Sequence, residues 1–240
     1  MTASVVVGGS SGIGASVVAA QRALGHEVVV WDLHHSADVE CDITDPDQVD
    51  AATAATVERV GAPDLVSITA GVGHGGMLLD APADDWDRVV GTNAKGVWLA
   101  MRALAAPMRE RGGSIVVTSS VSARLPDASM GLYCASKAAL DMVVRVAAVE
   151  WAPAIRVNAV APGVTDTRML GPAPRDRGWL AGVAERTTLA RLGTADDVAA
   201  AIVALHDLQW VTGEVLLCDG GLSLHSPIDP LGSHARSRDL

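Results

Sequence analysis

The chain opens with a strand, a glycine-rich turn, a helix and a second strand in immediate succession. Ser4–Val7 is a short β-branched run, and the turn Gly8–Gly14 reads GGSSGIG. Ala15–Leu24 is compatible with a helix, and Glu27–Trp31 is a second apolar run that ends next to Asp32. Such a unit is typical of an α/β domain with a parallel sheet, in which ligands bind where the carboxyl ends of the strands open out.

The glycine-rich turn is a candidate phosphate site. Glycines let the backbone turn sharply, and they let a pyrophosphate approach the main-chain N–H groups at a helix N-terminus, where the helix dipole also favours an anion. A tight left-handed connection without any ligand is the alternative explanation of the glycines. The acidic Asp32 at the end of the next strand favours the nucleotide site.

A second group of candidate residues lies between Ser114 and Trp151, a stretch that carries the only tyrosine of the chain. Ile115–Thr118 predicts a buried strand with serine hydroxyls, including that of Ser120, at its exit. Tyr133 lies four residues before Lys137, so a helix over this stretch places phenol and ammonium on one face, one turn apart. The serine and the Tyr/Lys pair can then converge on one substrate oxygen.

The chemistry that this trio can perform is proton transfer to an oxygen. A phenol with its ordinary pKa near 10 is a poor base at neutral pH, but a cation within about 4 to 6 Å favours the phenolate. We therefore expect Lys137 to hold the pKa of Tyr133 well below 10. Ser120 can hold an alcohol or carbonyl oxygen while Tyr133 moves its proton, which leaves the adjacent carbon ready to lose or gain a hydride. The hydride requires a nicotinamide as second partner.

The spacing of these motifs resembles that of the short-chain dehydrogenase/reductase family. The resemblance rests on Gly8-x3-Gly12-x-Gly14, on the spacing of thirteen residues from Ser120 to Tyr133 and on the spacing of four from Tyr133 to Lys137. Further matches in the same order are Asn93, Asn158–Gly163 and Asp219–Gly221. The likeness runs from Ser4 to about Leu224, and it implies a single doubly wound Rossmann-type α/β domain with helices on both faces of a parallel sheet.

The resemblance also implies the roles of particular residues. Tyr133 is expected to be the acid/base, Lys137 to lower the pKa of the phenol and bind a ribose, Ser120 to polarise the substrate oxygen, and Asn93 to open its helix around a water linked to Lys137. The expected cofactor-binding residues are Gly8, Ser10, Ser11, Gly12, Ile13, Gly14, Asp32, Leu33, Asp42, Ile43, Thr69, Ala70, Gly71, Tyr133, Lys137, Pro162, Gly163, Thr165 and Thr167. The sequence departs from the family pattern at Thr69, where an asparagine is usual, and at Val7, where a threonine is often found.

Asp32 bears on which nicotinamide cofactor is used. A carboxylate there can accept both ribose hydroxyls of NAD, but it faces the 2′-phosphate of NADP with a like charge. Ser11 is neutral where a basic residue often marks NADP users of the family, and we expect no arginine or lysine near Asp32. We therefore predict an NAD(H)-dependent oxidoreductase that interconverts a secondary alcohol and a ketone.

Two alternative functions stay open. One is a 3-oxoacyl-[acyl-carrier-protein] reductase that uses NADPH. The other is a catalytically silent protein that senses a nucleotide, although such proteins typically lose the tyrosine or the lysine and this chain keeps both.

The remaining stretches predict further elements. Pro46–Val60 is an alanine-rich amphipathic helix that Asp42 or Thr44 caps, and Ala83–Arg111 is one long helix. Residues 168–191, punctuated by proline and glycine, suit a mobile lid over the substrate, and a surface loop held by a few apolar contacts is the alternative.

Composition and charge narrow the class of protein. The 240 residues are 49% hydrophobic, enough for one domain over residues 1–224, followed by a tail over 225–240. A formal net charge of −10 disfavours nucleic acid and anionic membranes as partners. The three cysteines have no paired spacing, we find no signal peptide and no membrane-spanning run, and we expect a cytoplasmic protein. His74, in a glycine-rich loop, has no second ligand at suitable spacing, so we expect a solvated side chain and no metal site.

The helices predicted over Ala83–Arg111 and Met130–Trp151 carry apolar residues on more than one face. These residues are Val97, Trp98, Met101, Leu104, Leu140, Val143, Val144 and Val149. A helix that is apolar on several faces needs a second surface to cover it, so we expect a homotetramer built from pairs of these helices, as the resemblance also implies.

Overall fold

A seven-stranded parallel sheet forms the centre of the molecule. The computed structural model describes residues 1–33, 37–170 and 177–224, and within them the strand order is β3-β2-β1-β4-β5-β6-β7. The strands are β1 (Ala3–Val7), β2 (Glu27–Asp32), β3 (Val39–Glu40), β4 (Leu65–Ile68), β5 (Gly113–Thr118), β6 (Ile155–Pro162) and β7 (Val215–Cys218). The chain runs outward from β1 to β3 and then crosses back to β4, so the strand order reverses between β1 and β4, where such sheets bind ligands.

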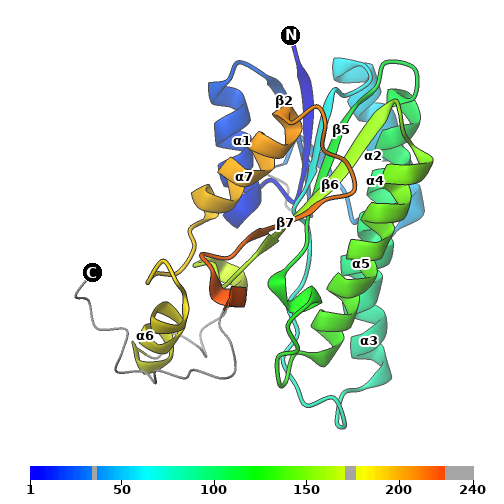
Figure 1. The fold of residues 1–240 in the computed structure, drawn as a ribbon. Helices are drawn as coiled ribbons and strands as arrows, with labels where there is room; N and C mark the ends of the chain where they lie inside the picture. The colour runs from blue at the N-terminus through cyan, green and yellow to red at the C-terminus, as the bar shows by residue number, and fades with distance from the viewer. Residues whose placement is uncertain (34–36, 171–176, 225–240) are drawn as a thin grey trace.

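Helices cover both faces of the sheet, as Figure 1 shows. On one face lie α1 (Gly12–Ala23) and α7 (Ala195–Asp207), and on the other lie α2 (Pro46–Val60), α4 (Val97–Met108) and α5 (Gly131–Glu150). Helix α3 (Ala83–Val90) precedes α4 in the chain, and α6 (Arg177–Arg186) lies beyond the carboxyl ends of the strands. The predicted doubly wound α/β fold is confirmed. None of the described helices is both long and apolar enough to cross a membrane.

The strands are apolar on both faces because both faces are covered. Val5 and Val6 are both fully buried and point to opposite sides. Val5 belongs to the core that includes Leu140 of α5, whereas Val6 belongs to the core that includes Val17 of α1 and Ile202 of α7.

The long helix predicted over Ala83–Arg111 is interrupted. Between α3 and α4 the residues Gly91–Gly96 form one π-helical turn, and the helix ends at Met108. A π turn inserts a residue into the helical repeat and is frequent at functional sites. It lies where Asn93 was expected to open the helix. Gly96, at the end of the turn, permits close packing, because a Cβ there would lie 3.0 Å from Ile43 Cγ1.

The cap predicted for α2 is also corrected. Asp45 caps this helix, since its side chain accepts hydrogen bonds from the N–H groups of Asp47 and Gln48. Pro46 occupies the first helical position, which makes the residue before it the cap. Asp42 instead accepts hydrogen bonds from the backbone and the hydroxyl of Thr44, at 2.8 and 2.7 Å.

Of the segment predicted as a lid, residues 168–170 and 177–191 are described, whereas Pro172 and Pro174 lie outside the described residues, as does the tail 225–240. The lid segment contains the short 3-10 turn Arg168–Leu170 and α6. After α6 the chain is fastened to the loop that follows β7. Leu189 N donates to Gly220 O at 3.0 Å, and Thr188 Oγ1 donates to Gly221 O at 3.0 Å.

Candidate active site

The glycine-rich turn connects β1 to α1 with backbone that only glycine adopts readily. Gly8 and Gly12 have φ values of +81° and +52°. A Cβ on Gly14 would lie 2.0 Å from Gly8 O, so the turn closes too tightly for any side chain there. Helix α1 begins directly after Ser11, whose side chain makes no capping hydrogen bond. The backbone N–H groups of the first helical turn are therefore not capped by a side chain.

Asp32 lies at the carboxyl end of β2, beside this turn. Its Oδ2 accepts a hydrogen bond from Ser10 N at 3.0 Å, and its Oδ1 accepts one from Leu33 N at 2.8 Å. The Leu33 side chain is exposed. The carboxylate is thus joined to the backbone of the glycine-rich turn, and this arrangement brings the predicted ribose acceptor and the predicted phosphate site together.

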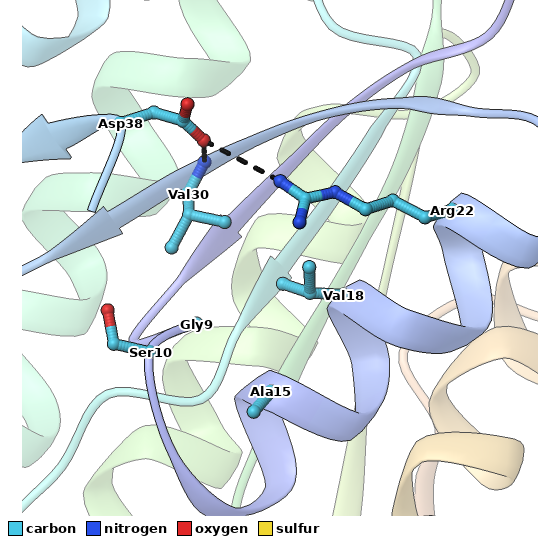
Figure 2. A pocket seen from close by; sticks show the side chains of 7 residues that line it. All are labelled: Gly9, Ser10, Ala15, Val18, Arg22, Val30 and Asp38. Atoms are coloured by element: carbon cyan, nitrogen blue, oxygen red, sulfur yellow. Dashed lines mark hydrogen bonds and ion pairs between the residues drawn. The ribbon is translucent and has the colours of Figure 1, made fainter. Parts of the chain in front are cut away.

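An arginine lies closer to this region than the sequence predicted. A cavity of about 340 Å³ next to the turn is lined by Gly9, Ser10, Ala15, Val18, Arg22, Val30 and Asp38 (Figure 2). Arg22 reaches it from the last turn of α1, and its guanidinium lies 3.9 Å from Asp38 Oδ2. Asp38 also pairs with Arg59 at 2.9 Å and accepts a hydrogen bond from Val30 N. The expectation that no arginine lies nearby is wrong, but the charge of Arg22 faces a carboxylate.

Thr69 braces the glycine-rich turn from β4. Its hydroxyl lies 3.1 Å from both Val7 O and Gly8 O and can donate to either. The backbone of Ala70 also packs against the turn, because a Cβ on Gly8 would lie only 2.6 Å from Ala70 N. The threonine that departs from the family pattern therefore supports the turn through its hydroxyl.

Asn93 fixes the loop that follows β4. Its Oδ1 accepts from Val72 N at 2.8 Å, and its Nδ2 donates to Val72 O at 2.9 Å and to Ser136 Oγ at 3.1 Å. A Cβ on Gly71 would lie 3.0 Å from Asn93 Oδ1 and 3.6 Å from Lys137 Nζ. The π turn, the exit of β4 and α5 therefore meet at Gly71. Asn93 and Lys137 both lie next to this glycine, which is consistent with the predicted link between them.

Lys137 and Tyr133 stand one turn apart on α5, as predicted. Lys137 is 4% exposed, and its Nζ donates to Thr118 O at 2.8 Å and lies 5.8 Å from the centre of the Tyr133 ring. Ser120, two residues beyond Thr118, is buried and hydrogen-bonds to Tyr133. The structure thus brings Ser120, Tyr133 and Lys137 together at the exit of β5.

The protonation behaviour of this pair differs from the expectation. Burial raises the pKa of Tyr133 from its ordinary value, and the hydrogen bond with Ser120 opposes this rise. Burial also lowers the pKa of Lys137 to about 8, against the favourable charge of Asp141. The predicted lowering of the phenol pKa is therefore wrong for the protein without cofactor, because the burial of Tyr133 outweighs its hydrogen bond with Ser120.

The turn after β6 faces the glycine-rich turn. A Cβ on Gly12 would lie 3.8 Å from Thr167 Cβ, which places Thr167 across from the start of α1. Thr165 is buried, and its hydroxyl donates to Gly163 O at 3.1 Å. Pro162 ends β6, and a Cβ on Gly163 would lie 2.8 Å from the Cα of Asp219, a residue of the matched Asp-Gly-Gly motif.

The remaining predicted residues lie further to the side. Ile43 is buried in the core that contains residues of α4 and α5. A second cavity, of about 330 Å³, is lined by Asp166, Leu170, Leu180 and Leu192. His74 is not solvated as expected, because its side chain is 5% exposed and its Nε2 lies 3.5 Å from Asp85 Oδ2.

Three residues outside the predicted set of site residues belong to the same region. Ser136 Oγ donates to Tyr133 O at 2.7 Å and accepts from Asn93, while Ser119 Oγ donates to Asp141 Oδ1 at 2.5 Å. Asp141 was visible in the sequence as the third member of a four-residue spacing that begins at Tyr133 and Lys137. Ser119 is one of the serines expected at the strand exit, but the sequence did not indicate its partner, and Ser136 carried no comparable signal.

Known proteins resemble the chain over most of its length. A family model described as enoyl-(acyl carrier protein) reductase matches residues 7–223. The chain is 34% identical to carbonyl reductase family member 4 of Danio rerio, over 92% of this chain and 97% of that protein. It is 32% identical to 2-(R)-hydroxypropyl-CoM dehydrogenase of Xanthobacter autotrophicus, over 90% of this chain and 96% of that protein.

Solved structures share the fold of the chain. The ligand-free structure of aldohexose dehydrogenase from Thermoplasma acidophilum matches with a TM-score of 0.89 and 28% identity, covering 95% of this chain and 96% of that one. With its sheet order, its glycine-rich turn and these relatives over nearly its full length, the chain belongs to the short-chain dehydrogenase/reductase family of oxidoreductases, whose dehydrogenases use nicotinamide cofactors.

Proposed function

We propose that the chain is an NAD(H)-dependent dehydrogenase that interconverts a secondary alcohol and a ketone. The observation that carries the proposal is the convergence of Ser120, Tyr133 and Lys137 at the exit of β5, where Lys137 Nζ lies 5.8 Å from the phenol ring. These are the groups that proton transfer to a substrate oxygen requires.

The residues present fit a nicotinamide dinucleotide. Gly8, Gly12 and Gly14 form a tight turn before α1, and the N–H groups of the first turn of α1, which no side chain caps, can donate to a pyrophosphate. The hydroxyls of Ser10 and Thr118 are buried and have no hydrogen-bond partner among the described residues, as is expected of a site that a ligand completes. When bound, the nicotinamide supplies the carbon that accepts or gives the hydride.

The other proposed cofactor contacts follow from position. Asp32 would accept the ribose hydroxyls near the adenine, with Leu33, Asp42 and Ile43 beside it, and Lys137 would bind the second ribose. Thr69, Ala70 and Gly71, at the exit of β4, would contact the dinucleotide. Thr165 and Thr167 would hold the nicotinamide amide and the phosphates from the turn that Pro162 and Gly163 begin.

Each side chain of the trio has a separate task in this proposal. Ser120 donates a hydrogen bond to the substrate oxygen, which orients it and polarises the adjacent carbon. Tyr133 takes the proton from an alcohol or returns it to a ketone oxygen. Lys137, while it is charged, favours the phenolate that forms on Tyr133. Asn93 keeps the neighbouring loop in place through Val72 and Ser136.

NAD is preferred over NADP in this proposal because of Asp32. Its carboxylate is held beside the turn by Ser10 N, and a 2′-phosphate about 4 Å away would be repelled by about 4 kcal/mol at an intermediate dielectric. Arg22 offers little relief, since Asp38 lies beside its guanidinium.

We also propose that the protein is a cytoplasmic homotetramer. The described cysteines Cys41, Cys134 and Cys218 are all free, which suits a reducing compartment. Of the apolar residues named for assembly, most are buried in the core, but Trp98 of α4 and Val149 of α5 are exposed, with Met142 and Val146 of α5. These four side chains are the apolar surface that a partner subunit would cover.

A panel of secondary alcohols and ketones, assayed by the absorbance of reduced nicotinamide, tests this function. We expect turnover of at least one alcohol class with NAD, and a lower kcat/KM with NADP for the same substrate. Turnover that depends on an acyl carrier protein thioester and NADPH would instead support the alternative reductase. The absence of turnover together with measurable NADH binding would support a nucleotide sensor.

A further inference from the structure

The exit of β5 is fastened to α5 at three consecutive residues. Thr118 O accepts from Lys137 Nζ at 2.8 Å, and Ser120 hydrogen-bonds to Tyr133. Between them, Ser119 Oγ donates to Asp141 Oδ1 at 2.5 Å. The helix residues of these three contacts are four apart in sequence and therefore share one face of α5 on successive turns: Tyr133, Lys137 and Asp141. The proposed function uses the first two and leaves the third without a task.

Asp141 is a buried carboxylate, 4% exposed, and burying such a group costs free energy unless other groups compensate it. Burial raises the pKa of Asp141, whereas the Ser119 hydrogen bond and the charges of Arg145, Arg124 and Lys137 lower it. These charged groups come from α5 itself and from the turn after β5. They favour an ionised Asp141 in the interior.

Lys137 needs such a neighbour. The residue is 4% exposed, and its ammonium donates to a neutral carbonyl, Thr118 O, which satisfies one donor but supplies no charge. Burial lowers the pKa of Lys137 to about 8, and the negative charge of Asp141 is what opposes this fall. Asp141 therefore acts on the site from one helical turn away, without touching the reacting atoms.

We propose that Asp141 is a positioning residue of the active site, which keeps the positive charge on Lys137 and, through Ser119, fixes the strand end that carries Ser120. This inference rests on the proposed function, in which Lys137 must be charged to assist Tyr133. It is tested first by a measurement that needs neither cofactor nor substrate.

The chain contains only two lysines, Lys95 and Lys137, so the titration of each can be followed by NMR of isotope-labelled lysine side chains. Lys95 is exposed and serves as internal reference, and Lys95→Arg assigns the two signals. In the wild-type protein we expect Lys137 to titrate near pH 8. In Asp141→Asn, which preserves shape and removes the charge, we expect the Lys137 midpoint to fall and the Lys95 midpoint to stay.

Activity provides the second readout. We expect kcat of Asp141→Asn at neutral pH to fall about tenfold, a change of about 1.4 kcal/mol in the activation barrier, and the alkaline limb of the pH profile to move to lower pH. Asp141→Glu, which keeps the charge, should recover most of the loss. Glu150→Gln removes a carboxylate from the exposed end of the same helix and should change neither the titration nor kcat.

An unchanged Lys137 midpoint in a folded Asp141→Asn protein would overturn the inference. If that variant does not fold, Ser119→Ala removes only one hydroxyl, and it should shift the Lys137 midpoint in the same direction by less. No shift in Ser119→Ala would then count against the inference. A shifted midpoint with unchanged kcat would leave Asp141 controlling the charge but contradict the proposed function of Lys137.

Discussion

At the scale of single residues, burial has the largest influence on the pKa values of Tyr133 and Lys137. Tyr133 and Lys137 are close enough to interact, but Tyr133 is partly buried and Lys137 is fully buried, which disfavours the charged form of each. Lys137, with a pKa of about 8, loses its charge at a pH below that at which an ordinary phenol ionises. Lys137 therefore stabilises a phenolate on Tyr133 only weakly unless other groups keep Lys137 protonated.

This order of effects predicts the titration of the only tyrosine in the chain. In the protein without cofactor, the phenolate absorbance should appear with a midpoint above the ordinary value near 10, because burial raises the pKa of Tyr133. Ultraviolet difference spectra against pH measure it, and Tyr133→Phe supplies the blank. A midpoint below 10 would show that the charge of Lys137 wins over burial.

The position of Asp32 leads to a prediction about cofactor preference. Asp32→Ala removes the carboxylate that would repel a 2′-phosphate, so the ratio of kcat/KM with NADH to that with NADPH should fall at least tenfold. Asp50→Ala, which removes an exposed carboxylate of α2, is the matched control and should leave the ratio unchanged. An unchanged ratio in Asp32→Ala would mean that another residue selects the cofactor.

At the scale of the elements, α7 is held to the sheet by a buried histidine. His206 Nε2 lies 2.9 Å from Ser67 Oγ of β4, and Nδ1 lies 3.0 Å from Ser114 Oγ of β5. Burial, together with the charge of Arg156, lowers the pKa of His206 to about 3. The neutral ring thus bonds two strands to one helix, and the folded state binds no proton there above about pH 3.

A pH dependence of stability follows from this contact. The unfolded chain takes up a proton at His206 below about pH 6.5 and the folded protein does not, so the free energy of unfolding falls as pH drops from about 6.5 towards 3. Urea unfolding at a series of pH values measures this slope. His206→Gln, which keeps hydrogen-bonding groups but does not titrate, should flatten it, and an equal slope in both proteins would show that other groups cause the acid sensitivity.

The sequence predicted most of the elements because their signals are local. The alternation of short apolar runs with helical stretches defined the parallel sheet, and the glycine spacing located the turn before α1. The π turn at Gly91–Gly96 and the Asp45 cap were missed, since both depend on how neighbouring residues share hydrogen bonds. Asp141, the partner of Ser119, and Asn93, one partner of Ser136, come from distant segments, so no local pattern could identify these contacts.

At the scale of the whole molecule, α4 and α5 lie side by side on one face of the sheet (Figure 1). Val149 is 79% exposed there, and Trp98, Met142 and Val146 are partly to largely exposed. An apolar surface of this kind is commonly covered by another subunit, and a closed symmetric assembly would cover it on every copy.

Light scattering after size exclusion, at micromolar concentration, tests this assembly. We expect the mass of a tetramer for the wild type, and a smaller species for Val149→Glu combined with Trp98→Glu, which place charges in the proposed interface. Glu150→Gln should keep the wild-type mass. A monomer mass for the wild-type protein would contradict the assembly and would leave the apolar surface of α4 and α5 without an explanation.

The central claim is that Tyr133 transfers the proton that accompanies hydride transfer. It is tested most directly by measuring kcat for alcohol oxidation, from the absorbance of reduced nicotinamide, in the wild type and in Tyr133→Phe. The variant loses only a hydroxyl, so cofactor binding should persist, while kcat should fall by a factor of about 10² to 10⁴, the usual contribution of a positioned acid or base. A Tyr133→Phe protein that binds NADH and keeps most of the wild-type turnover would contradict the claim.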